Sequence, residues 1–258
     1  MPRRIDPTGL VGGLNAVEAL IRSDPRRIRS LVVQRSSSNT KLHALQKLAQ
    51  DSGLRVRQLP SSSLDAWLPD IHQGVIAFCE TRSLDDWEPL RDRLLLAKKN
   101  GKSPIIVVPA ALEDPRNLGA CVRTAAGLGV DAILLPNKGS TGLTSTAGKA
   151  AAGMETVVPT CRVRDIEKEI KILVREGFLA LGLDAKGTKA AHVADLRVPL
   201  VLVLGGEDRG IPPHIARTLS GTIKLPMAEV CHSYNASVAL AILLYETSRQ
   251  RNFANLKP

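Results

Sequence analysis

Apolar runs and amphipathic segments alternate along the chain from residue 104 to the C-terminus. Short apolar runs predict strands over 105–108, 132–135, 178–183, 200–204 and 222–225, with a two-residue strand at 157–158. Apolar residues at helical spacing predict helices over 117–128, 145–152, 165–176, 213–219 and 237–249. The run 200–204 is apolar throughout, which is typical of a central parallel strand buried on both faces. This alternation predicts an α/β fold whose parallel sheet is covered by helices on both faces.

The first 80 residues form a smaller α/β pattern of their own. Helices are predicted over 12–21, 41–50 and 61–67, and strands over 28–33, 54–59 and 75–79. Residues 81–103 are charged and contain a leucine run at 94–96, which indicates a linker with a short helix. We therefore expect a small domain over 1–80, a linker over 81–103 and a larger domain over 104–258.

Composition excludes several classes of protein. Among the 258 residues, no apolar run reaches the ~18 residues that a membrane span needs, and no apolar segment follows the basic N-terminus as in a secretory signal. We expect a cytoplasmic protein that does not contact a membrane. The four cysteines, at 79, 121, 161 and 231, are too widely spaced for a zinc site or a disulfide framework, so reduced thiols and no metal are expected.

The net charge of +10 favours a polyanionic partner. The charge is diffuse, because residues 1–80 hold 11 Lys and Arg against 7 Asp and Glu, and residues 104–258 hold 18 against 14. Aromatic residues make up only 3% of the chain, so few are present to stack on single-stranded bases. Charge alone does not decide for nucleic acid.

Three polar loops follow predicted strands, at 113–123, 204–210 and 225–239. Ligands of parallel α/β sheets bind in loops outside the carboxyl ends of the strands, so the three loops predict one composite site. Taken alone, Asp114 to Asn117 could equally be a turn and a helix cap. Residues 142–149 depart from the Walker spacing, and 205–210 is not a dinucleotide-binding fingerprint.

The three loops together resemble the three motifs of the SpoU/TrmH family, in the SPOUT superfamily of RNA methyltransferases. The first family motif, D-P-x-N-x-G-x-x-x-R, corresponds to Asp114–Arg123, and the second, G-x-E-x-x-G, to Gly205–Gly210. The third motif resembles Leu225–Ala239, although Tyr234 stands where Leu is usual. Asp208 and Glu229 likewise stand where the family commonly has Gly. The segments 12–20 and 72–77 resemble the ends of the L30e-like substrate-binding domain found in the ribosomal members.

This resemblance implies a C-terminal domain with a deep trefoil knot, preceded by an L30e-like domain that binds RNA. It also implies a homodimer in which the first motif of one subunit lies near the cofactor of the other. The implied reaction is metal-free transfer of a methyl group from S-adenosylmethionine to a ribose 2′-hydroxyl. The implied substrate is guanosine in large-subunit (23S) ribosomal RNA, free or in a pre-ribosomal particle, and DNA is excluded because it lacks that hydroxyl.

Site residues carry over by position in the motifs. The resemblance implies catalytic roles for Asn117, Arg123, Glu207, Ser233 and Asn235. Arg123 would clamp a phosphate or accept the hydroxyl proton; the clamp is the safer assignment, because an arginine is too basic to be an easy proton acceptor. Asn117 would orient Arg123 or the ribose, while Glu207 and Asn235 would brace the site. The implied cofactor-binding residues are Leu204, Gly205, Gly206, Ile223, Leu225, Met227, Ser233, Tyr234 and Asn235.

Two alternatives stay open at this point. One is a transfer-RNA ribose methylase of the same family, against which the L30e-like segment argues. The other is a non-catalytic RNA-binding or ribosome-assembly factor, against which the intact Asn117, Arg123 and Glu207 argue.

Overall fold

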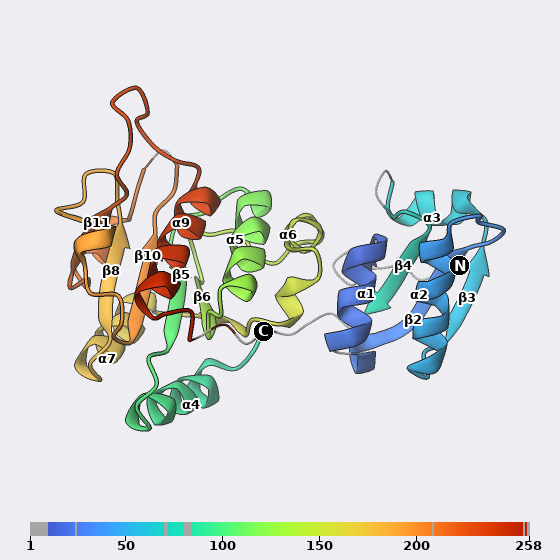
Figure 1. Cartoon of the computed structure of the whole chain (residues 1–258), viewed down its shortest axis with the longest axis horizontal. Helices are drawn as coiled ribbons and strands as arrows, with labels where there is room; N and C mark the ends of the chain where they lie inside the picture. The colour runs from blue at the N-terminus through green and yellow to red at the C-terminus, as the bar shows by residue number, and fades with distance from the viewer. Residues whose placement is uncertain are drawn as a thin grey trace.

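The computed structural model of the protein describes residues 10–23, 25–69, 72–79, 84–207, 209–254 and 256. Its C-terminal part is built on a seven-stranded sheet in the order β7-β6-β5-β10-β8-β11-β9, in which every neighbouring pair is parallel (Figure 1). The strands are β5 (Ile105–Pro109), β6 (Ala132–Pro136), β7 (Thr160–Val163), β8 (Leu179–Leu183), β9 (Lys189–Ala190), β10 (Leu200–Leu204) and β11 (Gly221–Lys224). The parallel α/β sheet predicted from the sequence is therefore confirmed.

Helices cover both faces of this sheet, as the all-apolar central strands require. Alternate residues of a strand point to opposite faces, so Leu200, Leu202 and Leu204 join one core while Val201 and Val203 join the other. The first core is covered by α5 (Pro115–Gly127), α6 (Ser145–Ala151) and α9 (Ala236–Gln250). The second is covered by α4 (Trp87–Lys99), α7 (Ile166–Arg175) and α8 (Pro213–Ala216).

The N-terminal part forms a separate four-stranded sheet in the order β1-β4-β2-β3. Its strands are β1 (Leu10–Gly12), β2 (Ile28–Gln34), β3 (Val56–Leu59) and β4 (Val75–Cys79); its helices are α1 (Leu14–Ser23), the short 3-10 turn η2 (Pro25–Arg27), α2 (Thr40–Asp51) and α3 (Ser61–Trp67). Helices α1 and α2 share one core, and α3 packs on the opposite face. We call this part the small lobe; its α1 and β1 contact α6 and the 3-10 turn η3 (Met154–Thr156) of the larger part (Figure 1).

Three differences from the predicted elements have simple causes. The strand predicted at 157–158 is wrong: η3 precedes these residues and β7 begins at Thr160, because two valines are too few to identify a strand. The two shortest strands, β1 and β9, were not predicted. The helix expected to be short in the linker is α4, with 13 residues, and Trp87 donates a hydrogen bond from Nε1 to Glu169 of α7 (2.7 Å). Residues 80–83, where that linker begins, lie outside the described residues.

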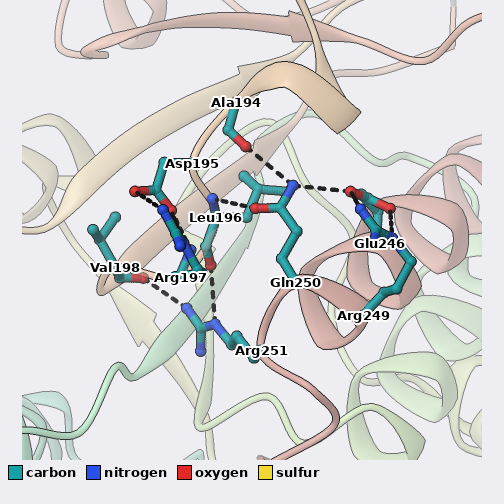
Figure 2. A network of polar contacts seen from close by, with 9 residues as sticks. All are labelled: Ala194, Asp195, Leu196, Arg197, Val198, Glu246, Arg249, Gln250 and Arg251. Carbon is teal, nitrogen blue, oxygen red and sulfur yellow. Dashed lines mark hydrogen bonds and ion pairs between the residues drawn. The ribbon is translucent and has the colours of Figure 1, made fainter.

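The C-terminal end of α9 is held by a network of polar contacts (Figure 2). Arg251 donates to three carbonyl oxygens, those of Leu196 (2.9 Å), Val198 (2.6 Å) and Ser103 (2.5 Å). The preceding Gln250 accepts from the amide of Leu196 (2.9 Å) and donates to the carbonyl of Ala194 (3.1 Å). The last helix is thereby joined to the segment that leads into the central strand β10.

Candidate active site

Four neighbouring strands of the larger sheet end at the same edge. Because β5, β10, β8 and β11 are parallel, the loops that follow them meet there. The loops after β8, β10 and β11 enclose a cavity of about 710 Å³. Two of the three loops from which the composite site was predicted, those after β10 and β11, thus line one hollow at the carboxyl edge of the sheet, whereas no residue of the loop at 113–123 lines it.

Three polar side chains, from the first turn of α5 and from the loops after β10 and β11, meet beside this cavity. Asn117 donates from Nδ2 to Glu207 Oε1, and Asn235 donates from Nδ2 both to Glu207 Oε1 (3.1 Å) and to Asn117 Oδ1 (3.1 Å). The three residues lie up to 118 positions apart in the sequence. We call this group the Asn–Glu–Asn cluster. Within it, Glu207 Oε1 accepts from both asparagine amides, so the three side chains hold one another in a fixed orientation.

Helix caps bring two members of the cluster into place. Asp114 caps α5 by accepting from the amide of Arg116 (2.8 Å), and Pro115 follows at the first helical position, where its missing N–H costs nothing. The cap alternative considered for Asp114 is therefore correct, and it places Asn117 in the first turn. Asn235 caps α9, since its Oδ1 accepts from the Ser237 amide (3.0 Å) and hydroxyl (2.7 Å) while its Nδ2 reaches the cluster.

The loop after β10 leaves no room for a side chain at Gly205 or Gly206. Gly206 and Gly210 exchange two backbone hydrogen bonds of 3.0 Å, which fold the loop back on itself. A Cβ added at Gly205 would lie 2.2 Å from the carbonyl carbon of Gly210. Glycine at 205 is therefore a steric requirement of this loop, and it leaves the backbone open to the cavity. Asp208, the departure from the family pattern within this loop, lies outside the described residues.

Most residues predicted to bind the cofactor line the cavity. These are Leu204, Gly205, Gly206, Leu225, Met227, Ser233, Tyr234 and Asn235, and Glu207 lines it as well. Ile223 does not: its side chain is buried in the core, and its carbonyl accepts from the amide of Asp184 (3.0 Å). Its place in the middle of β11 explains this, because only the end of that strand reaches the edge of the sheet.

Arg123 lies apart from the Asn–Glu–Asn cluster. It follows Asn117 by six residues of α5, a distance of about 9 Å along the helix axis. Its side chain is exposed, and the contacts of Asn117 are to Glu207 and Asn235. Asn117 therefore does not orient Arg123 through a hydrogen bond within the described residues. The first motif serves two places: its start lies at the cavity of its own chain, and its end lies on the outer surface of α5.

The sequence reasoning missed the loop after β8. Asp184, Ala185 and Lys186 line the cavity together with Arg209. Asp184 makes a tight turn, because its Oδ1 accepts from the Lys186 amide (2.7 Å) and its carbonyl from the Gly187 amide (2.9 Å). The sequence did indicate this loop indirectly. The strand over 178–183 was predicted, and in a parallel sheet its carboxyl end lies at the same edge of the sheet as the other loops of the site.

All four cysteines are thiols that form no disulfide, and three of the four are buried. Burial raises the pKa of the Cys121 thiol, on α5, to about 12, which leaves it uncharged at neutral pH. Cys231 is half-buried in the loop after β11, where its Sγ lies 3.4 Å from the Ser233 carbonyl oxygen. Within the described residues, no three His, Cys, Asp or Glu side chains are grouped as metal ligands would be. No helix of that part of the chain has the length and apolarity needed to cross a membrane.

Comparison with known proteins places this geometry in a family. Residues 104–245 match the model of the "SpoU rRNA Methylase family", and residues 10–84 match that of "RNA 2'-O ribose methyltransferase substrate binding". The chain is 33% identical to the 23S rRNA (guanosine-2'-O-)-methyltransferase RlmB of Pseudomonas putida, over 93% of this chain and 95% of that protein. It is 32% identical to YacO of Bacillus subtilis, a putative TrmH family tRNA/rRNA methyltransferase, over 93% and 95%.

Solved structures agree with these sequence relatives. The AdoMet-bound rRNA methyltransferase of Sinorhizobium meliloti superimposes with a TM-score of 0.71 at 25% identity, covering 93% of this chain and 86% of that one. The SpoU methyltransferase AviRb of Streptomyces viridochromogenes shares the fold with a TM-score of 0.76 at 20% identity, over 95% and 91%. With both family models matched in order, and relatives similar over nearly their whole length, the chain belongs to the SpoU rRNA methylase family.

Proposed function

We propose that this protein is an S-adenosylmethionine-dependent methyltransferase that modifies the ribose 2′-hydroxyl of a guanosine in 23S ribosomal RNA. The observation that carries the proposal is the Asn–Glu–Asn cluster at the rim of the 710 Å³ cavity, in a chain whose relatives include several RlmB proteins. The match to a substrate-binding model over residues 10–84 supports RNA as the substrate class.

The cavity fits S-adenosylmethionine. Its volume lies within the range of about 300–1,000 Å³ that small-ligand sites have. Its walls combine the apolar Leu204, Leu225 and Met227 with open backbone at Gly205 and Gly206, which suits an adenosine held by main-chain hydrogen bonds. When bound, this cofactor supplies an electrophilic methyl group, and the reaction needs no metal.

The residues of this chain then have to align the ribose 2′-hydroxyl with the methyl group and let the proton of that hydroxyl leave. Correct orientation alone can lower a barrier by several kcal/mol. We assign the positioning of the ribose to the Asn–Glu–Asn cluster, because its side chains already fix each other and do not have to reorganise. Ser233 lines the same cavity and is exposed to an incoming nucleotide. Arg123 clamps the phosphate next to the target ribose.

We further propose that the enzyme is a homodimer in which Arg123 acts in the site of the partner subunit. Helix α9 exposes Val238 (47%), Ile242 (39%) and Tyr245 (57%) at helical spacing, so it offers an apolar stripe to a second copy. The stripe adjoins α5, which packs against α9 and carries the exposed Arg123. A two-fold interface on these helices would bring each Arg123 close to the other subunit.

The remaining expectations from the sequence belong to the same proposal. We propose that residues 1–80 form an L30e-like RNA-binding domain, that 81–103 connect it to the catalytic domain over 104–258, and that the latter is tied in a deep trefoil knot. The position of β11 supports the knot, because this later strand lies between the consecutive strands β8 and β9, so the segment that joins those two strands has to cross over it. We place the enzyme in the cytoplasm, acting on free RNA or on a pre-ribosomal particle.

The substrate is tested by giving the purified protein tritiated S-adenosylmethionine with unmodified 23S rRNA or tRNA and mapping the methylated nucleotide. We expect label on one guanosine of the ribosomal RNA. Label in tRNA alone would refute the substrate, and no transfer to either RNA would favour a non-catalytic binding factor. The variant Arg123→Ala should lose transfer while keeping cofactor affinity, whereas Arg175→Ala, on exposed α7 surface, should behave as wild type.

A mixing experiment tests the shared site. Asn117→Ala damages the cavity of its own subunit, and Arg123→Ala damages only the arginine that it offers. If Arg123 acts across the dimer, random mixing gives half mixed dimers with one complete site each, so about a quarter of the wild-type activity returns. No recovery, or a monomer by light scattering at micromolar concentration, would refute the shared site.

A further inference from the structure

The small lobe contains a second cavity, of about 560 Å³, at the N-terminal ends of α1 and α2. Its polar lining includes four side-chain amides and one lysine: Asn15, Gln34, Asn39, Gln73 and Lys41. Of the described residues that line it, none carries a carboxylate. Four amides and a cation around one hollow form an unusually donor-rich surface, and neither the family nor the fold described above requires it.

Gln73 is held in a constrained conformation at this cavity. Its backbone is left-handed, with φ of 49°, which is uncommon for a residue other than glycine. Its side-chain Oε1 accepts from the amide of Leu14 (3.0 Å) and so caps α1. With the oxygen engaged, the Nε2 donors of Gln73 are available to a ligand. Constrained residues of this kind are often found at binding sites, where the surrounding structure holds them.

His72 fixes the loop that carries Gln73. It is buried, its Nδ1 accepts from the amide of Gly74 (2.9 Å), and its Nε2 therefore carries the proton and donates to Asp65 (2.8 Å). The imidazole thus ties the loop to α3 with both of its nitrogens used. Its role here is to position the loop.

The other lining groups also present donors. Asn39 caps α2, because its Oδ1 accepts from the amides of Lys41 (3.0 Å) and Leu42 (3.4 Å). The Nδ2 donors of Asn39 take no part in this cap. The Lys41 ammonium is exposed, as is the Asn15 amide. A ligand that complements this surface carries several acceptor oxygens, a negative charge, and an edge with both donors and acceptors for Asn15 and Gln34.

We propose that this cavity binds one unpaired nucleotide of the substrate RNA, with its phosphate at Lys41 and its base edge at the amides of Asn15 and Gln34. The volume suits a single nucleotide. Amide side chains pair with base edges through one donor and one acceptor each; in a duplex the Watson–Crick edge is already paired, and the major groove of A-form RNA is too narrow for side chains to read. This inference rests on the proposed function, since it takes RNA as the substrate, and it adds a subsite distant from the methyl-transfer cavity.

The test uses the full chain and unmodified 23S rRNA fragments, and measures RNA affinity, cofactor affinity and melting temperature for each variant. Gln73→Glu is the sharpest variant, because a carboxylate keeps the oxygen that caps α1 but removes the donors and adds a repelling charge. Lys41→Ala has a matched control in Lys47→Ala, which removes the same charge from another exposed position of the same helix, outside the cavity. The control for Asn15→Ala is Gln50→Ala, which removes an exposed side-chain amide of α2 outside the cavity.

We expect Gln73→Glu, Lys41→Ala and Asn15→Ala each to weaken RNA binding about tenfold, with unchanged cofactor affinity and melting temperature. Lys41→Ala should also reduce the slope of log affinity against log salt by about 0.7, and Lys47→Ala should not. Affinities within twofold of wild type for all three variants would overturn the inference while the wild-type enzyme still methylates RNA. Equal competition by a fully paired duplex would overturn it as well. If the variants lose RNA affinity as expected but the wild-type protein does not methylate RNA, only the proposed function is refuted.

Discussion

Replacing Arg251 by alanine should destabilise the larger sheet although this residue lies far from the cavity. The guanidinium donates to three carbonyls at 2.5, 2.6 and 2.9 Å, and it joins the end of α9 to residues that flank β5 and β10. No other described side chain donates to those three oxygens. Without Arg251, these three partly buried carbonyl oxygens can be satisfied only by water.

The expected loss in the free energy of unfolding is the difference between opposing contributions. A hydrogen bond from a charged donor contributes about 1.5–3 kcal/mol, so three bonds set an upper limit of about 4.5–9 kcal/mol. Desolvation opposes this: burial lowers the pKa of Arg251, and the nearby Asp131 only partly restores it. Partly buried carbonyls also regain water in the variant. We expect a loss of about 3–5 kcal/mol for Arg251→Ala, the range found when one partner of a buried charged contact is removed. Arg251→Lys should recover part of the loss, because an ammonium keeps the charge but lacks the planar fork.

Urea unfolding measures this loss. Trp87 is buried in the larger part of the chain, so its fluorescence in a Trp67→Phe background reports on the larger sheet. The midpoint should fall with an unchanged m-value, whereas Arg249→Ala, which removes a single ion pair between an exposed arginine and Glu246, should lower it far less, because exposed ion pairs contribute little. A change below about 1 kcal/mol for Arg251→Ala would refute the reasoning, since it would mean that the carbonyls are equally well solvated without the arginine.

Three further predictions concern other parts of the chain. A thiol reagent should label Cys231 first and Cys121 only on unfolding, because burial raises the pKa of Cys121; added cofactor should slow labelling at Cys231, as mass spectrometry of the labelled peptides would show. Gly205→Ala should abolish cofactor binding by calorimetry, and normal affinity would contradict the 2.2 Å clash in the loop. The Arg249 guanidinium lowers the pKa of Glu246 to about 2, so this contact stabilises the fold above pH 4.5 and is lost as the pH falls toward 2. Glu246→Gln should accordingly lose slightly less stability than wild type between pH 5 and 2, and an equal loss would contradict the pairing.

The fold was predictable because local patterns dominate it. The fully apolar run at 200–204 predicted a central strand, and it became β10 with the same bounds. The cap at Asp114 was anticipated as a polar residue before a helix pattern, whereas the cap at Asn235 was not predicted. In contrast, β1 and β9 have three and two residues, too few for any periodicity, and their pairing is decided by the neighbouring strands.

The site was predictable only in part, for a physical reason. The motifs identified Glu207 and Asn235, but not that both would bond to Asn117 of the same chain, since side-chain contacts across 90 and 118 positions leave no periodic signal. Lys186 was not identified as a cavity residue because its loop contains no recognisable motif, although that loop follows a predicted strand. The donor-rich cavity of the small lobe escaped too, because it depends on the left-handed conformation of Gln73.

The way in which the Asn–Glu–Asn cluster is assembled has a consequence for synthesis of the protein. Its last member, Asn235, begins the final helix, and that helix is anchored by Arg251, seven residues before the C-terminus. Domains fold in the order in which they emerge, so the small lobe can form while the rest is still being made. The cluster cannot form until residue 251 has emerged, because the helix that begins after Asn235 is anchored there. A chain terminated between residues 84 and 235 would therefore retain the small lobe without the Asn–Glu–Asn cluster, and, with the RNA affinity proposed for that lobe, such a fragment would compete with the intact enzyme for the same RNA.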